Sequence, residues 1–232
     1  MKKTLLMAAA TLAAGVISIQ AQVYSQNIVG YVNTVLPGSG AYSMICSPFA
    51  GTTNLDAVVT SIQPGDIVYL WTGANYSSYT YIGAGVGDNG YSFVDVNSAW
   101  VPSPTVTTGQ GFFYFTGSGN QQTNTFVGTV LMTNNVALAG SGAYSMVASS
   151  LPIGGAIDST NFNIPFSPGD IVYLWTGTDY ASYTFIGTGV GDNGYSFVDV
   201  NSAWVPSPTL TVGQGFFYFS GSGNAATWKQ GM

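Results

Sequence analysis

The chain of 232 residues contains no histidine, no arginine and no glutamate, and only 5% of its residues are charged. Without histidine, Ser-His-Asp and Cys-His catalytic arrangements are excluded. The chain has three lysines and nine aspartates, and two of the lysines, Lys2 and Lys3, lie at the N-terminus. Nucleic-acid binding depends on Lys and Arg side chains that neutralise phosphates, so this composition argues against a nucleic-acid partner.

Cysteine is almost absent as well. A lone Cys46 cannot form an internal disulfide, and the corresponding position of an internal repeat is Ala148. We therefore predict that Cys46 is a small buried residue, with an intermolecular disulfide as the alternative. The low charge does not indicate disorder, because 46% of the residues are hydrophobic and β-prone types are plentiful.

The first residues have the pattern of a secretory signal peptide. Two lysines precede an apolar run from Leu5 to about Ile19, which is followed by small and polar residues. We predict a signal peptide over residues 1–21 and a mature chain without a membrane span, because no later apolar run approaches the roughly 18 residues that a span needs. A retained signal anchor is the alternative. The protein is thus expected to be secreted or held at the cell surface.

The stretch VGDNGYSFVDVNSAWVPSPT occurs at residues 86–105 and again, unchanged, at 190–209. Residues 64–120 align with 168–224 and differ at only eight positions. A repeat of about a hundred residues has the size of one domain. We predict a first module over residues 22–124 and a second over 125–232. Residues 126–130 resemble both the opening and the closing of a module, so the junction stays open.

Within each repeat the pattern favours short strands. Apolar and β-prone runs are separated by turn residues, and Asp88-Asn89-Gly90 predicts a hairpin turn with positive φ angles. One helical pattern over residues 55–62 predicts a short turn of helix at most. In the first repeat, the expected strands cover 27–35, 41–47, 66–72, 79–85, 91–96, 110–116 and 123–131. The predicted fold is all-β, with two tandem antiparallel β-sandwich or jelly-roll-like modules.

The order NIVGYVNTVLPGSGAYSMICSPF, PGDIVYLWTG, YSSYTYIG and GQGFFYF resembles a family of uncharacterised secreted β-modules from environmental Gram-negative bacteria. It is similar, more loosely, to sandwich modules of surface and adhesin-type proteins. The resemblance covers nearly all of both repeats. It implies a secreted or surface β-protein and brings no catalytic residues with it.

A carbohydrate site is one candidate function. Pyranose rings stack on aromatic faces, while amides and carboxylates bind hydroxyl groups. The predicted ligand-binding residues, three from each repeat, are Trp100, Asp95, Asn97, Trp204, Asp199 and Asn201. Packing in the core or between the modules is the alternative for Trp100, and Trp71 is predicted to lie in the core.

Two further candidates rest on aspartates. A calcium site would use clustered oxygen ligands, and its predicted residues are Asp88, Asn89, Asp95, Asp192, Asn193 and Asp199. An aspartate-based glycoside hydrolase would need two opposed carboxylates, drawn from Asp66, Asp88 or Asp95 and their repeats. A turn role is the alternative for each of these residues.

The leading prediction is an exported, non-enzymatic structural or adhesive protein of the cell surface or matrix. The near-exact duplication, the uncharged polar composition and the missing catalytic residue types motivate it. A carbohydrate-binding protein is the alternative. The expected partners are polysaccharides or other surface proteins, and self-association through strand edges with few charges is also expected. Apart from calcium, no cofactor is predicted.

Overall fold

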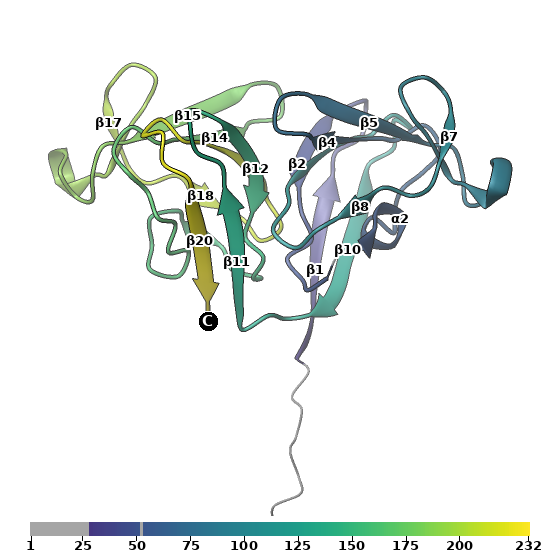
Figure 1. The fold of residues 1–232 in the computed structure, drawn as a ribbon, viewed down its shortest axis with the longest axis horizontal. Helices are drawn as coiled ribbons and strands as arrows, with labels where there is room; N and C mark the ends of the chain where they lie inside the picture. Colours follow the sequence, from purple (N-terminus) through teal and green to yellow (C-terminus); the bar gives the residue numbers. More distant parts are fainter. Residues whose placement is uncertain (1–27, 52) are drawn as a thin grey trace, which may run out of the picture.

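The computed structural model describes residues 28–51 and 53–232, so the predicted signal peptide lies outside the described residues. Two similar, nearly all-β modules lie side by side (Figure 1). Each is built on a six-stranded antiparallel sheet, and the strand order of one sheet repeats that of the other. The predicted fold class is confirmed.

The first sheet has the order β2-β9-β4-β5-β6-β7. Its strands are β2 (Tyr42–Ile45), β9 (Phe112–Phe115), β4 (Ile67–Trp71), β5 (Tyr76–Tyr81), β6 (Phe93–Val94) and β7 (Trp100–Val101). The second sheet has the order β12-β19-β14-β15-β16-β17. Its strands are β12 (Tyr144–Ala148), β19 (Gly215–Phe219), β14 (Ile171–Trp175), β15 (Tyr180–Phe185), β16 (Phe197–Val198) and β17 (Trp204–Val205).

Two-stranded ribbons cover one face of each sheet. They pair β1 (Val29–Leu36) with β10 (Gln122–Thr129), β3 (Thr53–Asn54) with β8 (Thr105–Val106), β11 (Thr133–Leu138) with β20 (Ala226–Gly231), and β13 (Gly155–Ala156) with β18 (Thr209–Leu210). In the first module, Leu36 and Phe126 of the long ribbon pack with Val68, Phe112 and Tyr114 of the sheet. Each module is therefore sandwich-like, with its own core.

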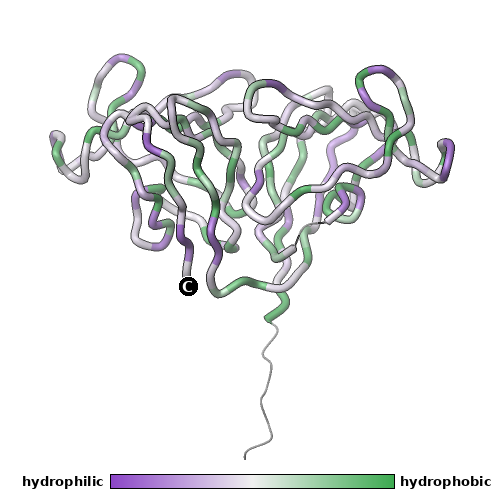
Figure 2. Tube along the Cα trace, viewed as in Figure 1, coloured by the Kyte–Doolittle hydropathy of each residue, from purple (hydrophilic) through white to green (hydrophobic). Residues whose placement is uncertain are grey.

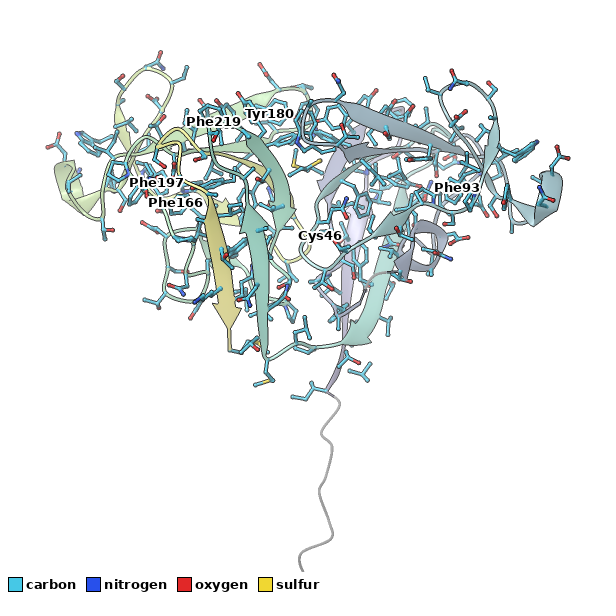
Figure 3. The ribbon with its side chains drawn as sticks, viewed as in Figure 1. Cys46, Phe93, Phe166, Tyr180, Phe197 and Phe219 are labelled. Atoms are coloured by element: carbon cyan, nitrogen blue, oxygen red, sulfur yellow. The ribbon has the colours of Figure 1, made fainter. Side chains whose placement is uncertain are left out.

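Hydrophobic residues follow the strands, and many of the most hydrophilic residues fall in loops and turns (Figure 2). Phe93 and Phe197 are buried in the cores of the two modules, and Phe166, partly buried, packs against the second core (Figure 3). The sheets also have a second apolar face. In β9, Phe112 and Tyr114 enter the core of the first module, whereas Phe113 belongs to a separate cluster that the two modules share. The second module therefore covers part of the sheet face that the ribbons leave open.

The predicted boundary after residue 124 is wrong. It falls inside β10, whose residues pair with β1 from Gln122↔Leu36 to Thr129↔Val29. The ladder hydrogen bonds thus hold the whole of β10 in the first module. The linker between the modules consists of the three residues between β10 and β11.

The predicted short turn of helix is confirmed, and the predicted turn with positive φ angles is present, but it lies within the loop between β5 and β6 rather than directly joining two strands. Asn89 and Gly90 have φ of 58° and 73°, and the Tyr91 N–H donates to the Asp88 carbonyl at 3.2 Å. These are the features of a type I′ turn, which coincides with the short turn η1 (Asp88–Gly90) and has η2 (Asp192–Gly194) as its repeat. The helix α2 spans only Leu55–Val58. Within residues 28–51 and 53–232, none of the helices is long and apolar enough to cross a membrane.

Candidate functional site

The predicted tryptophan platform is packed against its own module. Trp100 and Trp204 are half-buried, and each indole ring lies on a glycine of the preceding loop. A Cβ added at Gly87 would lie 2.2 Å from Cε3 of Trp100, and one added at Gly191 would lie 2.1 Å from Cε3 of Trp204. At least part of each ring face is thus covered by backbone, which accords with the packing alternative.

The aspartates beside these tryptophans close turns. Oδ1 of Asp95 accepts hydrogen bonds from the backbone N–H groups of Asn97 and Ala99, both at 2.9 Å. In the second module, Asp199 accepts equivalent bonds from Asn201 and Ala203. The bond from Ala99, followed by those from Asn97, outweighs desolvation and lowers the pKa of the Asp95 carboxyl. These carboxylates shape the loop between β6 and β7 and its repeat between β16 and β17.

The calcium ligands proposed from the sequence remain a prediction. Asp88 and Asn89, with their repeats Asp192 and Asn193, belong to the type I′ turns, while Asp95 and Asp199 hold the loops described above. Across the described part of the chain, no three Asp, Glu, His or Cys side chains come together in a metal-binding group. Any calcium ion here would rely mainly on amide, backbone and water oxygens.

Asp66, a candidate for glycoside hydrolysis, is fully buried. Its carboxylate accepts hydrogen bonds from Gln63 N–H at 2.8 Å, Ser118 N–H at 2.9 Å, Gln122 Nε2 at 2.7 Å and the Tyr114 hydroxyl. Burial raises the pKa of this carboxyl, but the bonds, led by that from Gln122, outweigh burial and lower it. Asp66 therefore ties the turn before β4 to the loop after β9, which is the turn role.

The feature that sequence reasoning missed is an aromatic surface shared by the two modules. Six aromatic residues from each module form it, and we call these twelve residues together the aromatic surface. In the first module they are Tyr42, Tyr69, Trp71, Tyr76, Phe113 and Phe115, and their repeats are Tyr144, Tyr173, Trp175, Tyr180, Phe217 and Phe219. They come from β2, β4, β5 and β9 and from the equivalent strands of the second module.

Reciprocal contacts join the two halves of this surface. The indole N–H of Trp71 donates to the Tyr144 carbonyl at 3.1 Å, and that of Trp175 donates to the Tyr42 carbonyl at 3.0 Å. Trp71 also meets Phe217 edge to face, with ring centroids 5.3 Å apart at 84°, and Trp175 meets Phe113 at the same distance and angle. The same patch of each module thus contacts its counterpart, as in a two-fold symmetric dimer. Trp71, predicted to lie in the core, is partly buried and packs against the core cluster that the two modules share, because its indole reaches across to the other module.

The backbone follows the same symmetry beneath the rings. Cys46 N–H donates to the Gly213 carbonyl at 2.9 Å, and Ala148 N–H donates to the Gly109 carbonyl at 3.0 Å. The buried Cys46 thiol lies between the modules, with Sγ 3.6 Å from the Ser149 carbonyl (Figure 3). Burial raises its pKa to about 12. Cys46 is therefore the small buried residue predicted from the sequence.

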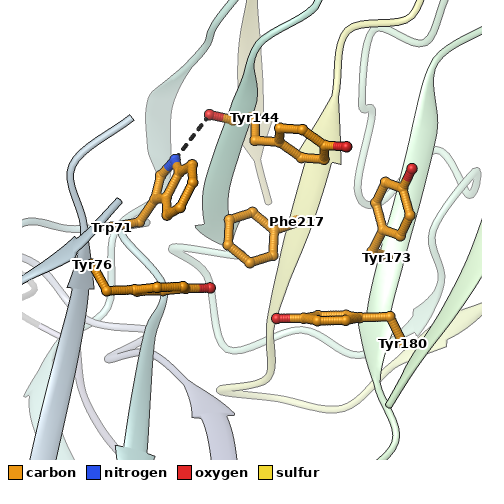
Figure 4. Close-up of a pocket in the computed structure, with 6 residues that line it drawn as sticks. All are labelled: Trp71, Tyr76, Tyr144, Tyr173, Tyr180 and Phe217. Atoms are coloured by element: carbon orange, nitrogen blue, oxygen red, sulfur yellow. Dashed lines mark hydrogen bonds between the residues drawn. The ribbon is translucent and has the colours of Figure 1, made fainter. Parts of the chain in front are cut away.

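Two equivalent cavities open on the aromatic surface. One, of about 270 Å³, is lined by Trp71, Tyr76, Tyr144, Tyr173, Tyr180 and Phe217 (Figure 4). The other, of about 240 Å³, is lined by Tyr42, Tyr69, Tyr76, Phe113, Trp175 and Tyr180. Tyr76 and Tyr180 line both cavities, and their hydroxyls point toward each other from the two modules (Figure 4).

The chemistry of these cavities is uncharged. Every lining side chain is aromatic, and the polar groups are tyrosine hydroxyls and an indole N–H. Burial, followed by the contact with Tyr180, raises the pKa of Tyr76, and burial with a neighbouring tyrosine raises the pKa values of Tyr69 and Tyr173 to about 12. These phenols stay neutral at ordinary pH. The cavities therefore offer ring faces together with hydroxyls that both donate and accept.

No family model matches this chain, and no curated protein or solved structure shows significant similarity to it. The assignment of a site therefore rests on geometry alone. One feature of the sequence could have indicated the aromatic surface. In β4, Val68 faces the core while Tyr69 and Trp71 face the opposite side, and a sandwich of two layers has no second core to cover them.

Proposed function

We propose that this protein is an exported, non-enzymatic adhesive protein that binds neutral carbohydrate through the aromatic surface. The observation that carries the proposal is a pair of open, wholly aromatic cavities built jointly by the two modules. The carbohydrate class expected from the sequence is retained, but its site moves from Trp100 and Trp204 to the junction between the modules.

The lining residues support an uncharged ring ligand. A pyranose presents a flat apolar face of C–H groups that packs on an aromatic ring, while its hydroxyls exchange hydrogen bonds with phenols. Anionic ligands lack a partner here, because no Lys or Arg lines either cavity. A cage for a quaternary ammonium ion would enclose the cation within ring faces. Here Tyr42 and Tyr144 are 38% and 40% exposed, so the rings are better suited to a ligand that lies along the surface.

Several features support binding without turnover. The chain has no histidine, and the buried Asp66 is committed to a turn. No aspartate lines either aromatic cavity, so acid catalysis has no carboxyl group at the site. An exported protein with these properties would act by holding polysaccharide, as expected of an adhesive role at a cell surface or in a matrix.

The test is a pull-down of the full chain on insoluble cellulose, xylan, starch and β-1,3-glucan. We expect retention on at least one of these polymers. Tyr76→Ala/Tyr180→Ala is expected to weaken that retention at least about tenfold, because it removes two central exposed rings whose loss would cost more than about 1.4 kcal/mol.

The control is Trp100→Ala/Trp204→Ala, which alters the tryptophans outside the aromatic surface and should retain binding. Near-ultraviolet circular dichroism checks the folding of both variants. If the tyrosine variant does not fold, Tyr76→Phe/Tyr180→Phe keeps the rings and removes only the hydroxyls, and it should bind with a smaller loss. Retention on none of the polymers, or loss of retention in the tryptophan control alone, would overturn the proposal.

A further inference from the structure

We infer that the two aromatic cavities are equivalent subsites of one site, filled by separate sugar rings of a single oligosaccharide chain that crosses the junction. This inference rests on the proposed function and specifies its ligand as an oligomer rather than a monosaccharide. It follows from the shared wall of the cavities, their symmetry and the absence of charge.

The shared wall places the cavities next to each other. Tyr76 and Tyr180 line both of them, and each of these rings is more than a third exposed. Their ring centroids lie 6.0 to 6.4 Å from those of Phe113 and Phe217, the buried rings of the shared cluster. A chain leaving one cavity therefore passes over tyrosine rings before it enters the other.

The symmetry makes the two subsites chemically alike. Each lining residue of one cavity has its repeat in the other, as Tyr69 has Tyr173 and Phe113 has Phe217. Both subsites should therefore take the same kind of ring. A two-fold axis also reverses the direction of a chain relative to each subsite. Recognition must then depend on ring faces and spacing, and a chain can bind in either direction.

Linkage of two rings determines the expected affinity. Once one ring is bound, the second binds at a high effective concentration, and such linkage commonly raises affinity by about 10² to 10⁴. A monosaccharide instead fills each subsite independently. The affinity should therefore rise sharply at the chain length that first reaches both cavities, and the stoichiometry should fall from two ligands per protein to one.

The experiment is isothermal titration calorimetry of the full chain with glucose oligomers of one to eight units, in β-1,4, β-1,3 and α-1,4 series. In at least one series we expect an affinity rise of about a hundredfold over one or two added units. Tyr69→Ala alters only the cavity of about 240 Å³, and Tyr173→Ala alters only the cavity of about 270 Å³. In each single variant the sharp rise in affinity should disappear, and the remaining weak binding should not depend on oligomer length. The loss of affinity should be the same in both variants.

The outcomes separate this inference from the proposed function. Binding that increases smoothly or not at all with length, or that stays at two oligomers per protein, would overturn the shared site and leave carbohydrate binding in place. Loss of the long oligomer in Tyr69→Ala without any effect of Tyr173→Ala would also overturn it. If a variant does not fold, Tyr69→Phe and Tyr173→Phe should show equal, smaller losses. Binding of no oligomer in any series would count against the proposed function itself.

Discussion

The indole N–H groups of Trp71 and Trp175 each join one module to the other, and replacing them with phenylalanine tests that role. The substitution keeps an aromatic ring but removes the donor to Tyr144 or Tyr42. A hydrogen bond of this kind contributes about 0.5–1.5 kcal/mol, and the smaller ring gives up part of an edge-to-face contact worth a similar amount. We therefore expect each variant to lower the free energy of unfolding by about 1–2 kcal/mol.

Urea unfolding followed by far-ultraviolet circular dichroism measures this change. Because the contacts are reciprocal, the two single variants should agree within about 0.5 kcal/mol, the precision to which independent effects usually add. Trp100→Phe, which changes a ring packed on Gly87 within one module, provides a comparison outside the junction. A loss in only one of the two junction variants, or no loss in either, would refute the reciprocal junction.

Three further predictions concern single side chains. Cys46, buried and with its pKa raised to about 12, should not react with a thiol reagent in the native protein at mildly alkaline pH, and should react fully in guanidinium chloride. Rapid native labelling would contradict its burial. Because its pKa is lowered on folding, Asp66 stabilises the protein above the carboxyl's unfolded pKa of about 3.9, and this contribution disappears as pH falls through the lower folded value. The free energy of unfolding of Asp66→Asn should therefore fall less on acidification than that of the wild-type protein. The same pH dependence in both proteins would exclude this role. Gly87→Ala should lower the free energy of unfolding by about 1–3 kcal/mol, because the new methyl group meets the Trp100 ring. An unfolding temperature equal to that of the wild-type protein would contradict this prediction, because it would show that the loop accommodates the methyl group without loss of stability.

Much of the fold could be predicted because its signals are local. The β-prone run at 66–72 and the Asn89-Gly90 pair depend on neighbouring residues, and they predicted β4 and the turn with positive φ angles. The module boundary depended on a distant partner. Residues 126–130 have strand character on either side of the junction, and only the pairing of β10 with β1 assigns them to the first module.

Only the aromatic character of the candidate site could be predicted from the sequence. An aromatic ligand surface was expected, but sequence spacing does not reveal that a glycine 13 residues away lies against the Trp100 ring. The role of Asp95 was more accessible, since an aspartate followed by two turn residues commonly bonds the backbone just ahead of it. The junction itself arises from contacts over about 70 to 130 residues, such as Trp175 to Tyr42, which no local pattern encodes.

The most direct test of the central claim uses tryptophan fluorescence to locate the bound sugar. The full chain is titrated with the longest glucose oligomer that binds, alongside Trp71→Phe/Trp175→Phe and Trp100→Phe/Trp204→Phe. Trp71 and Trp175 line the aromatic cavities, whereas Trp100 and Trp204 lie outside them. We predict that the ligand-induced change in emission is lost in the first double variant and kept in the second. The opposite pattern would contradict a binding site at the junction of the two modules.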